Sequence, residues 1–195
     1  YLRPAVVLTL ILTIVTGFLY PGIITGIAQL IFPYQANGSL IKDSSGKVIG
    51  SELIGQYWSQ PQYFHGRPSA TSNLNGTPTP YEADNSTASN LGPTSATLVK
   101  NVQQRIADLK KENPNAPPGP VPVDLVTTSG SGLDPDISIA GALYQAPRIA
   151  AARGLSQDTV TQVINNHETG RFLAIFGEPY VNVLDLNLAL DALKK

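Results

Sequence analysis

One short run holds the side chains best suited to chemistry in this sequence. The run is His65, Gly66, Arg67, Pro68 and Ser69. The planar guanidinium of Arg67 can hold a carboxylate with two parallel hydrogen bonds, and Gly66 and Pro68 restrict the backbone around it. We expect an ion pair inside the folded domain, with Asp134 or Asp136 as the carboxylate. A contact between Arg67 and another protein is the alternative interpretation.

The sequence offers few other groups for catalysis. It has no cysteine and 2 histidines, so a thiolate site is excluded and a histidine metal site would need carboxylates from elsewhere; we expect no metal. It lacks the phosphate-binding G-x-x-x-x-G-K-[ST] loop and the DKTGT sequence in which P-type pumps are phosphorylated. The SGSG sequence at 129–132 could present N–H groups to an anion, but it is more typical of a turn. A hydrolase that uses His65 with a nearby Ser or Asp remains the alternative, although no G-x-S-x-G motif accompanies it.

A long apolar segment precedes these groups. Residues 5–32 contain no charged side chain. At about 1.5 Å per residue, a helix of this length exceeds the ~30 Å hydrocarbon core of a bilayer. The segment therefore predicts a transmembrane anchor, which with its flanks occupies residues 1–34. Pro21 is expected to kink this helix, because its ring clashes with the carbonyl of Gly17 and it has no N–H to donate.

Small residues recur along the predicted anchor. Thr9, Thr13 and Gly17 are spaced by four and share one face, and Gly22 and Gly26 form a G-x-x-x-G pair. Such residues allow two helix backbones to approach closely in lipid. We expect this stripe to pack on a neighbouring membrane helix; the alternative is an anchor that faces only lipid.

Residues 35–195 are expected to form a single domain. Because short strands and separate helices are both predicted in it, the expected fold class is α+β. The expected elements are a hairpin over 39–50, a helix over 94–113, a strand over 121–126, helices over 139–153 and 156–167, a strand over 180–183 and a helix over 184–195. Ser138 should cap the 139–153 helix and Gly154 should end it. The aromatic residues Tyr57, Trp58, Tyr63 and Phe64 are expected in the core. The net charge of −1 argues against nucleic acid as a partner.

Several motifs occur in a characteristic order along the chain. They are PYQANGSLI (33–41), ELIGQ (52–56), FHGRPSAT (64–71), VPVDLVTTSGSGLDPDIS (121–138), ALYQAPRIAAARGLS (142–156) and GEPYVNVLDLNLALD (177–191). Together they resemble the C subunit of the bacterial potassium-transporting Kdp P-type ATPase complex. The resemblance implies a non-catalytic accessory subunit of an ATP-driven high-affinity potassium uptake pump. Its implied role is to stabilise the complex and to promote ATP binding by the catalytic subunit.

The resemblance also implies partners and a location. The partners are a potassium-selecting channel-like subunit, an ATP-hydrolysing P-type subunit and a small membrane peptide, all in the lipid bilayer. The implied location is the bacterial inner membrane, crossed once, with a cytoplasmic N-terminus and an extracytoplasmic domain at 35–195. The charges alone leave the orientation open, because Arg3 precedes the helix whereas Lys42 and Lys47 follow it.

A nucleotide is the one cofactor that the resemblance brings into question. The family is described as ATP-binding, and Gln145 is the position to which a nucleotide contact would be assigned. A domain outside the membrane has no access to cytoplasmic ATP. We therefore expect Gln145 to be a surface or capping side chain, and we expect no bound cofactor.

Overall fold

The computed structural model describes residues 1–193, and the chain divides into two compact units, Tyr1–Ser51 and Glu52–Lys195. The elements of the first unit are α1 (Leu2–Ile14), the π-helical segment η1 (Val15–Leu19), α2 (Tyr20–Ile31), α3 (Pro33–Ala36), β1 (Leu40–Lys42) and β2 (Val48–Ser51). The strands β1 and β2 pair antiparallel, as the sequence predicts. Their turn is held by the Asp43 carboxylate, which accepts hydrogen bonds from the N–H groups of Ser45 and Lys47 at 2.8 and 3.0 Å.

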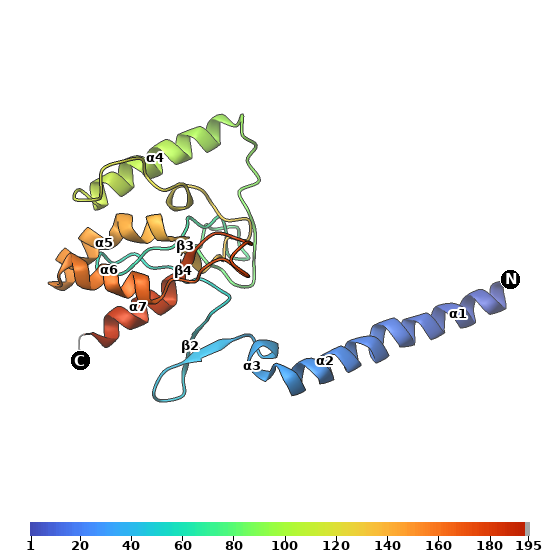
Figure 1. Ribbon diagram of the computed structural model, residues 1–195. Helices are drawn as coiled ribbons and strands as arrows, with labels where there is room; N and C mark the ends of the chain where they lie inside the picture. The colour runs from blue at the N-terminus through green and yellow to red at the C-terminus, as the bar shows by residue number, and fades with distance from the viewer. Residues whose placement is uncertain (194–195) are drawn as a thin grey trace. The chain divides into compact units, whose positions relative to one another are not determined.

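The apolar segment forms one helix, Leu2–Ile31, which is long and apolar enough to cross a membrane and has none of its residues buried within the chain. Pro21 changes the hydrogen bonding of this helix. The segment η1, which contains Gly17, is π-helical, and the ribbon continues through it without a sharp break (Figure 1). The carbonyl of Gly17, with which the ring of Pro21 would clash, thus lies in a π-helical segment, an irregularity that occurs within long helices.

The second unit is α+β, as expected. Its elements are α4 (Ala96–Glu112), the 3₁₀ turn η2 (Val123–Leu125), β3 (Asp136–Ser138), α5 (Ile139–Arg153), α6 (Gln157–Asn166), β4 (Tyr180–Asn182) and α7 (Val183–Ala192). The strands β3 and β4 pair antiparallel, with Ile137 opposite Val181. In Figure 1, α5, α6 and α7 lie together, with α4 beyond α5. Their apolar faces enclose a core that includes Phe64, Ile149, Ile164, Leu186 and Leu190, all fully buried.

The helix ends follow local signals in the sequence. Ser138 accepts a hydrogen bond from the N–H of Gly141 at 2.9 Å, and Gly154 ends α5 with a φ of 66°. Ser156 caps α6 in the same way through the N–H of Thr159. These predicted caps are confirmed, because a cap depends only on residues within one helical turn of it.

Three expectations about this unit are wrong. Residues 121–126 contain the 3₁₀ turn η2 (Val123–Leu125) and no strand, because the prolines at 120 and 122 fix φ and remove donors from a ladder. Tyr57 is 63% exposed, although Phe64 is buried and Trp58 packs against the core. The helix expected over 184–195 ends at Ala192, so Leu193 lies beyond α7. The last two residues of the helix expected over 184–195 lie outside the described residues.

Candidate functional site

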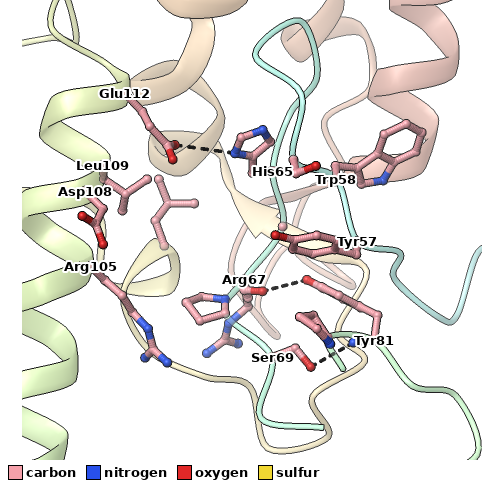
Figure 2. A pocket seen from close by; sticks show the side chains of 15 residues that line it. Tyr57, Trp58, His65, Arg67, Ser69, Tyr81, Arg105, Asp108, Leu109 and Glu112 are labelled. Carbon is pink, nitrogen blue, oxygen red and sulfur yellow. Dashed lines mark hydrogen bonds and ion pairs between the residues drawn. The ribbon is translucent and has the colours of Figure 1, made fainter. Parts of the chain in front are cut away.

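The run from His65 to Ser69 lines a pocket of about 380 Å³ on one side of α4 (Figure 2). One wall is the chain from Tyr57 to Tyr81, and the opposite wall is formed by Arg105, Asp108, Leu109 and Glu112 of α4. The structure therefore brings the predicted run into a single hollow with mixed charge. The pocket combines aromatic rings, two arginines and two carboxylates.

Arg67 forms the expected ion pair, and its partner is Asp134. Its Nη1 lies 2.9 Å from Oδ2 of Asp134, and its Nη2 donates to the carbonyl of Thr128 at 3.4 Å. The guanidinium thus holds one carboxylate oxygen and one backbone carbonyl instead of both carboxylate oxygens. Asp136 accepts a hydrogen bond from Asn182 instead, at 3.3 Å. Arg67 therefore ties residues 65–69 to the segment that leads into β3.

The ring of His65 contacts groups that fix its position, an arrangement that suits a structural role better than proton transfer in catalysis. Its Nε2 lies 3.0 Å from the carbonyl oxygen of Gln60, and its Nδ1 lies 3.7 Å from the carboxylate of Glu112. Burial lowers the pKa of His65, and the nearby cation of Arg148 lowers it further. The ring is therefore neutral near pH 7. Neither of these two partners is a nucleophile that a histidine base could activate.

The backbone on both sides of His65 is held by two buried side-chain amides. Gln145 in α5 accepts a hydrogen bond from the N–H of His65 at 2.9 Å and donates to its carbonyl at 3.1 Å. Asn187 in α7 does the same to Phe64, at 2.8 and 3.1 Å. Both amides are fully buried. The expectation of a surface or capping role for Gln145 is wrong, because its amide pairs with an extended segment 80 residues away in the chain.

The Gln145 amide makes two further hydrogen bonds. Its Nε2 donates to the carbonyl of Gly141 at 3.3 Å, and its Oε1 accepts a second hydrogen bond from Arg148 at 2.8 Å. A nucleotide contact at Gln145 would have to break bonds that hold the backbone of His65 in place. The arrangement therefore assigns this side chain to the architecture of the domain.

Two arginines of α5 fix the chain just before His65. Arg148 donates to the carbonyl oxygens of Pro61 and Tyr63 at 2.5 and 3.1 Å. Arg153 donates to the carbonyl of Gln62 at 2.7 Å, pairs with Asp191 at 2.9 Å, and lies 5.0 Å from the centre of the Tyr63 ring. Arginine suits this task because its fork of donors stays charged and can reach several oxygens at once.

Tyr81 closes the other end of the pocket. Its hydroxyl donates to the carbonyl of Arg67 at 2.8 Å, and its N–H donates to Oγ of Ser69 at 3.1 Å (Figure 2). A Cβ at Gly66 would lie 2.4 Å from the Tyr81 hydroxyl, so only glycine fits at this close approach. Burial raises the pKa of the Tyr81 hydroxyl, which therefore stays protonated and continues to donate. Ser69 in turn donates to the carbonyl of Gly132 at 2.7 Å.

The other predicted polar residues lie at the entry to α5. The carboxylate of Asp124 accepts hydrogen bonds from the N–H and the hydroxyl of Ser138, at 2.7 and 3.1 Å. Burial, together with the charge of Asp134, raises the pKa of Asp136 to about 6. The 129–132 segment is a turn in which Ser129 accepts the N–H of Gly132 at 2.8 Å. Within residues 1–193, no group of three or more His, Asp or Glu side chains could hold a metal ion.

Several of the residues that build this site were missed by sequence reasoning. They are Tyr81, Arg148, Arg153 and Asn187. Each acts on a segment distant in the sequence, so no local spacing reveals it. The motif YQAPR at 144–148 was the one available signal, because it places Gln145 and Arg148 one turn apart on α5.

The small residues of the apolar helix make few contacts within the chain. The hydroxyl of Thr13 donates to the carbonyl of Thr9 at 2.8 Å, which satisfies that hydroxyl inside the helix. In the described part of the chain, nothing lies within 4 Å of a Cβ built at Gly17, Gly22 or Gly26. The stripe is therefore free to receive another helix, and its packing remains a prediction.

Comparison with known proteins gives a family match along almost the whole chain. The profile of KdpC, described as the K+-transporting ATPase c chain, matches residues 2–192. A potassium-transporting ATPase KdpC subunit of Rhodopseudomonas palustris (strain BisB18) is 54% identical over 199 residues, covering 99% of this chain and 98% of its own length. The KdpC subunit of strain BisB5 is 56% identical, with 98% and 96% covered. That of Sorangium cellulosum (strain So ce56) is 54% identical, with 98% and 97% covered.

Proposed function

This chain belongs to the KdpC family, the c chain of the K+-transporting ATPase, and from this premise we propose that it is an accessory subunit of the pump. In this role it stabilises the complex and promotes ATP binding by the catalytic subunit. The family match over residues 2–192 carries the proposal. The proposed partners are a potassium-selecting channel-like subunit, the ATP-hydrolysing P-type subunit and a small membrane peptide. In the proposed topology the helix Leu2–Ile31 crosses the bacterial inner membrane once, and the domain lies outside.

The geometry of the pocket supports a non-catalytic role. The groups that could have served chemistry are engaged in holding the fold: Gln145 and Arg148 bind backbone groups of 61–65, and Arg67 binds Asp134 and Thr128. A domain in which these side chains bind its own backbone and carboxylates is suited to act through its surface. We propose that its effect on ATP affinity is transmitted through the assembled complex.

The hydrolase alternative receives no support from the site. A histidine general base needs a hydroxyl, thiol or water to activate and a second group to orient its ring. The ring of His65 contacts the carbonyl of Gln60 and the carboxylate of Glu112, and burial disfavours its protonated form. The family match favours the accessory role, so the hydrolase interpretation is dropped.

The proposal is tested by producing the pump with and without this chain. An affinity tag on the chain should co-purify the P-type and channel-like subunits from native membranes. Complexes that lack the chain should lose subunits during purification, and those that survive should show a higher KM for ATP in potassium-stimulated hydrolysis. The isolated chain should show no such hydrolysis. Potassium-stimulated ATPase activity of the chain alone, or an unchanged pump without it, would contradict the proposal.

A further inference from the structure

Residues 169–180 form a hairpin whose tip is apolar and exposed. Bridges between Thr169 and Tyr180 and between Phe172 and Phe176 define its two arms. The exposed fractions of the large tip residues are 72% for Phe172, 68% for Leu173, 71% for Ile175 and 61% for Phe176. These values are far above those of the core residues of the same unit, so the tip is an exposed apolar feature of the domain.

The apolar character extends around the whole tip. Phe172 and Phe176 oppose each other as a pair, so they lie on one face, while Leu173 and Ile175 flank the turn beyond them. All four are more than half exposed. A docking site for one protein surface is usually apolar on one face only. A tip whose four large side chains are all apolar and exposed suits contact with an apolar medium.

The backbone of the tip pairs most of its N–H groups internally. Phe172 and Phe176 exchange N–H···O bonds of 2.9 Å, and the N–H groups of Ala174 and Ile175 donate to the carbonyls of Arg171 and Phe172 at 3.1 and 3.2 Å. Hydrocarbon offers no partner to a free N–H or C=O, so internal pairing is the condition for backbone to enter lipid. The N–H groups of Phe172, Ala174, Ile175 and Phe176 meet this condition, which suits shallow insertion where the remaining groups can reach water and headgroups.

The turn residues point to the same conclusion. Leu173 and Ala174 have φ values of 52° and 60°, the left-handed conformation that a type I′ turn requires at both central positions. Asn-Gly adopts this turn with little strain, whereas Leu and Ala pay a conformational cost there. The sequence thus places a large apolar side chain at the very end of the hairpin, where a turn alone would favour polar residues.

The base of the hairpin has the character of a membrane interface. Arg171 forms an ion pair with Glu178 at 2.5 Å, and the ring of Tyr180, with its polar hydroxyl, lies beside them in the sequence. Aromatic rings with a polar end favour the boundary between lipid and water. The domain also follows the apolar helix after residues 32–51, a segment that reaches at most roughly 70 Å. A bilayer crossed by that helix would lie within this reach of Glu52.

We propose that the hairpin tip, residues 172–176, inserts into the surface of the lipid bilayer that holds the N-terminal helix. The domain would then meet the membrane at a second point, distinct from its anchor. This inference does not depend on the accessory role in the pump, because it concerns the chain and lipid alone.

The test uses the full chain reconstituted by itself in liposomes. The sequence has no cysteine, so Ala174→Cys supplies a single thiol at the tip for an environment-sensitive fluorophore. Asn75→Cys, in an exposed polar turn, is the matched control. We expect quenchers attached to the lipid acyl chains to quench the tip probe several-fold more than the control, and aqueous iodide to give the opposite order.

A second variant separates the tip residues from the probe itself. Phe172→Ser with Phe176→Ser, carrying the same label at 174, should return the tip to the quenching pattern of Asn75→Cys, with an unchanged circular dichroism spectrum. Lipid quenching that persists in this variant would overturn the proposal, as would equal quenching at the two label positions. Shielding of the tip only in the assembled pump would assign it to a protein partner and would equally overturn it.

Discussion

At the scale of single residues, two side-chain amides take the place of a neighbouring strand. Phe64 and His65 are extended and have their backbone groups paired with Asn187 and Gln145 instead of with another strand. A carboxamide carries one donor side and one acceptor side, as a peptide group does, so each can satisfy both backbone groups of one residue. Buried backbone groups must be paired, and here the two helices α5 and α7 supply the pairs.

Removing the Gln145 amide should therefore destabilise the domain. Gln145→Ala leaves the N–H and C=O of His65 without partners in a buried site, which we expect to lower the free energy of unfolding by about 3 kcal/mol. Denaturant unfolding of the full chain in detergent, followed by Trp58 fluorescence, measures the loss. Gln104→Ala in the exposed face of α4 is the control and should change stability by less than ~0.5 kcal/mol. Equal stability of the two variants would show that the hydrogen bonds between the Gln145 amide and the backbone of His65 contribute little to stability.

Asp136 should give the domain a distinct pH dependence. Burial and the charge of Asp134 raise its pKa to about 6 in the folded state, above the ordinary value of 3.8 for this side chain. The folded state therefore binds the proton more tightly, so this stabilisation is complete at low pH and is lost as the pH rises toward and through 6. Asp136→Asn removes the buried charge and keeps the acceptor for Asn182. The melting temperature of this variant should exceed that of the parent at pH 8 and match it near pH 4. If the variant and the parent differ in melting temperature by the same amount at both pH values, Asp136 does not have the raised pKa.

At the scale of elements, the sequence predicted those helices whose ends and apolar faces depend on residues within a single segment. The cap at Ser138, the left-handed Gly154 and the apolar period of α4 each lie within one segment, and the corresponding helices are present. The turn η2 was mistaken for a strand because alternating valines fit both structures. The strand β3 was missed because it is three residues long and pairs with β4, far along the chain. The hairpin at 169–180 was missed for a similar reason, since its apolar tip lacks the usual Asn-Gly turn signal.

The helix Leu2–Ile31 allows a clean test of the small-residue stripe. A side chain at Gly17 meets no other atom of the described chain, so Gly17→Leu should leave the helix itself intact. If the stripe packs on a partner helix, the added side chain should force the backbones apart and reduce the recovery of partner subunits with the tagged chain several-fold. Val15→Leu, on nearly the opposite side of the helix, is the control. Equal recovery with the two variants would mean that the stripe faces lipid.

At the scale of the whole molecule, the sequence indicated some of the residues that line the pocket but few of the contacts that hold them there. The run 65–69 does line the main pocket, and Arg67 does pair with Asp134. The reasons for this placement lie in α5 and α7, whose side chains reach back over tens of residues. Such pairings depend on how helices pack, and the spacing of Gln145 and Arg148 within YQAPR does not reveal which distant segment they bind. Family membership, in contrast, was readable from ordered motifs spread along the whole chain.

The engaged state of Gln145 also predicts how the whole chain responds to nucleotide. A ligand present at 100 times its Kd stabilises a folded protein by about 2.7 kcal/mol. Because the Gln145 amide is occupied by His65, Gly141 and Arg148, we expect millimolar Mg-ATP to leave the melting temperature of the isolated full chain unchanged. Inorganic triphosphate is the control for non-specific anion effects. The same chain added to a pump that lacks it should lower the KM for ATP, which places the nucleotide effect in the complex. A saturable rise in melting temperature with ATP but not with triphosphate, abolished by Gln145→Ala, would instead make this chain a nucleotide-binding subunit.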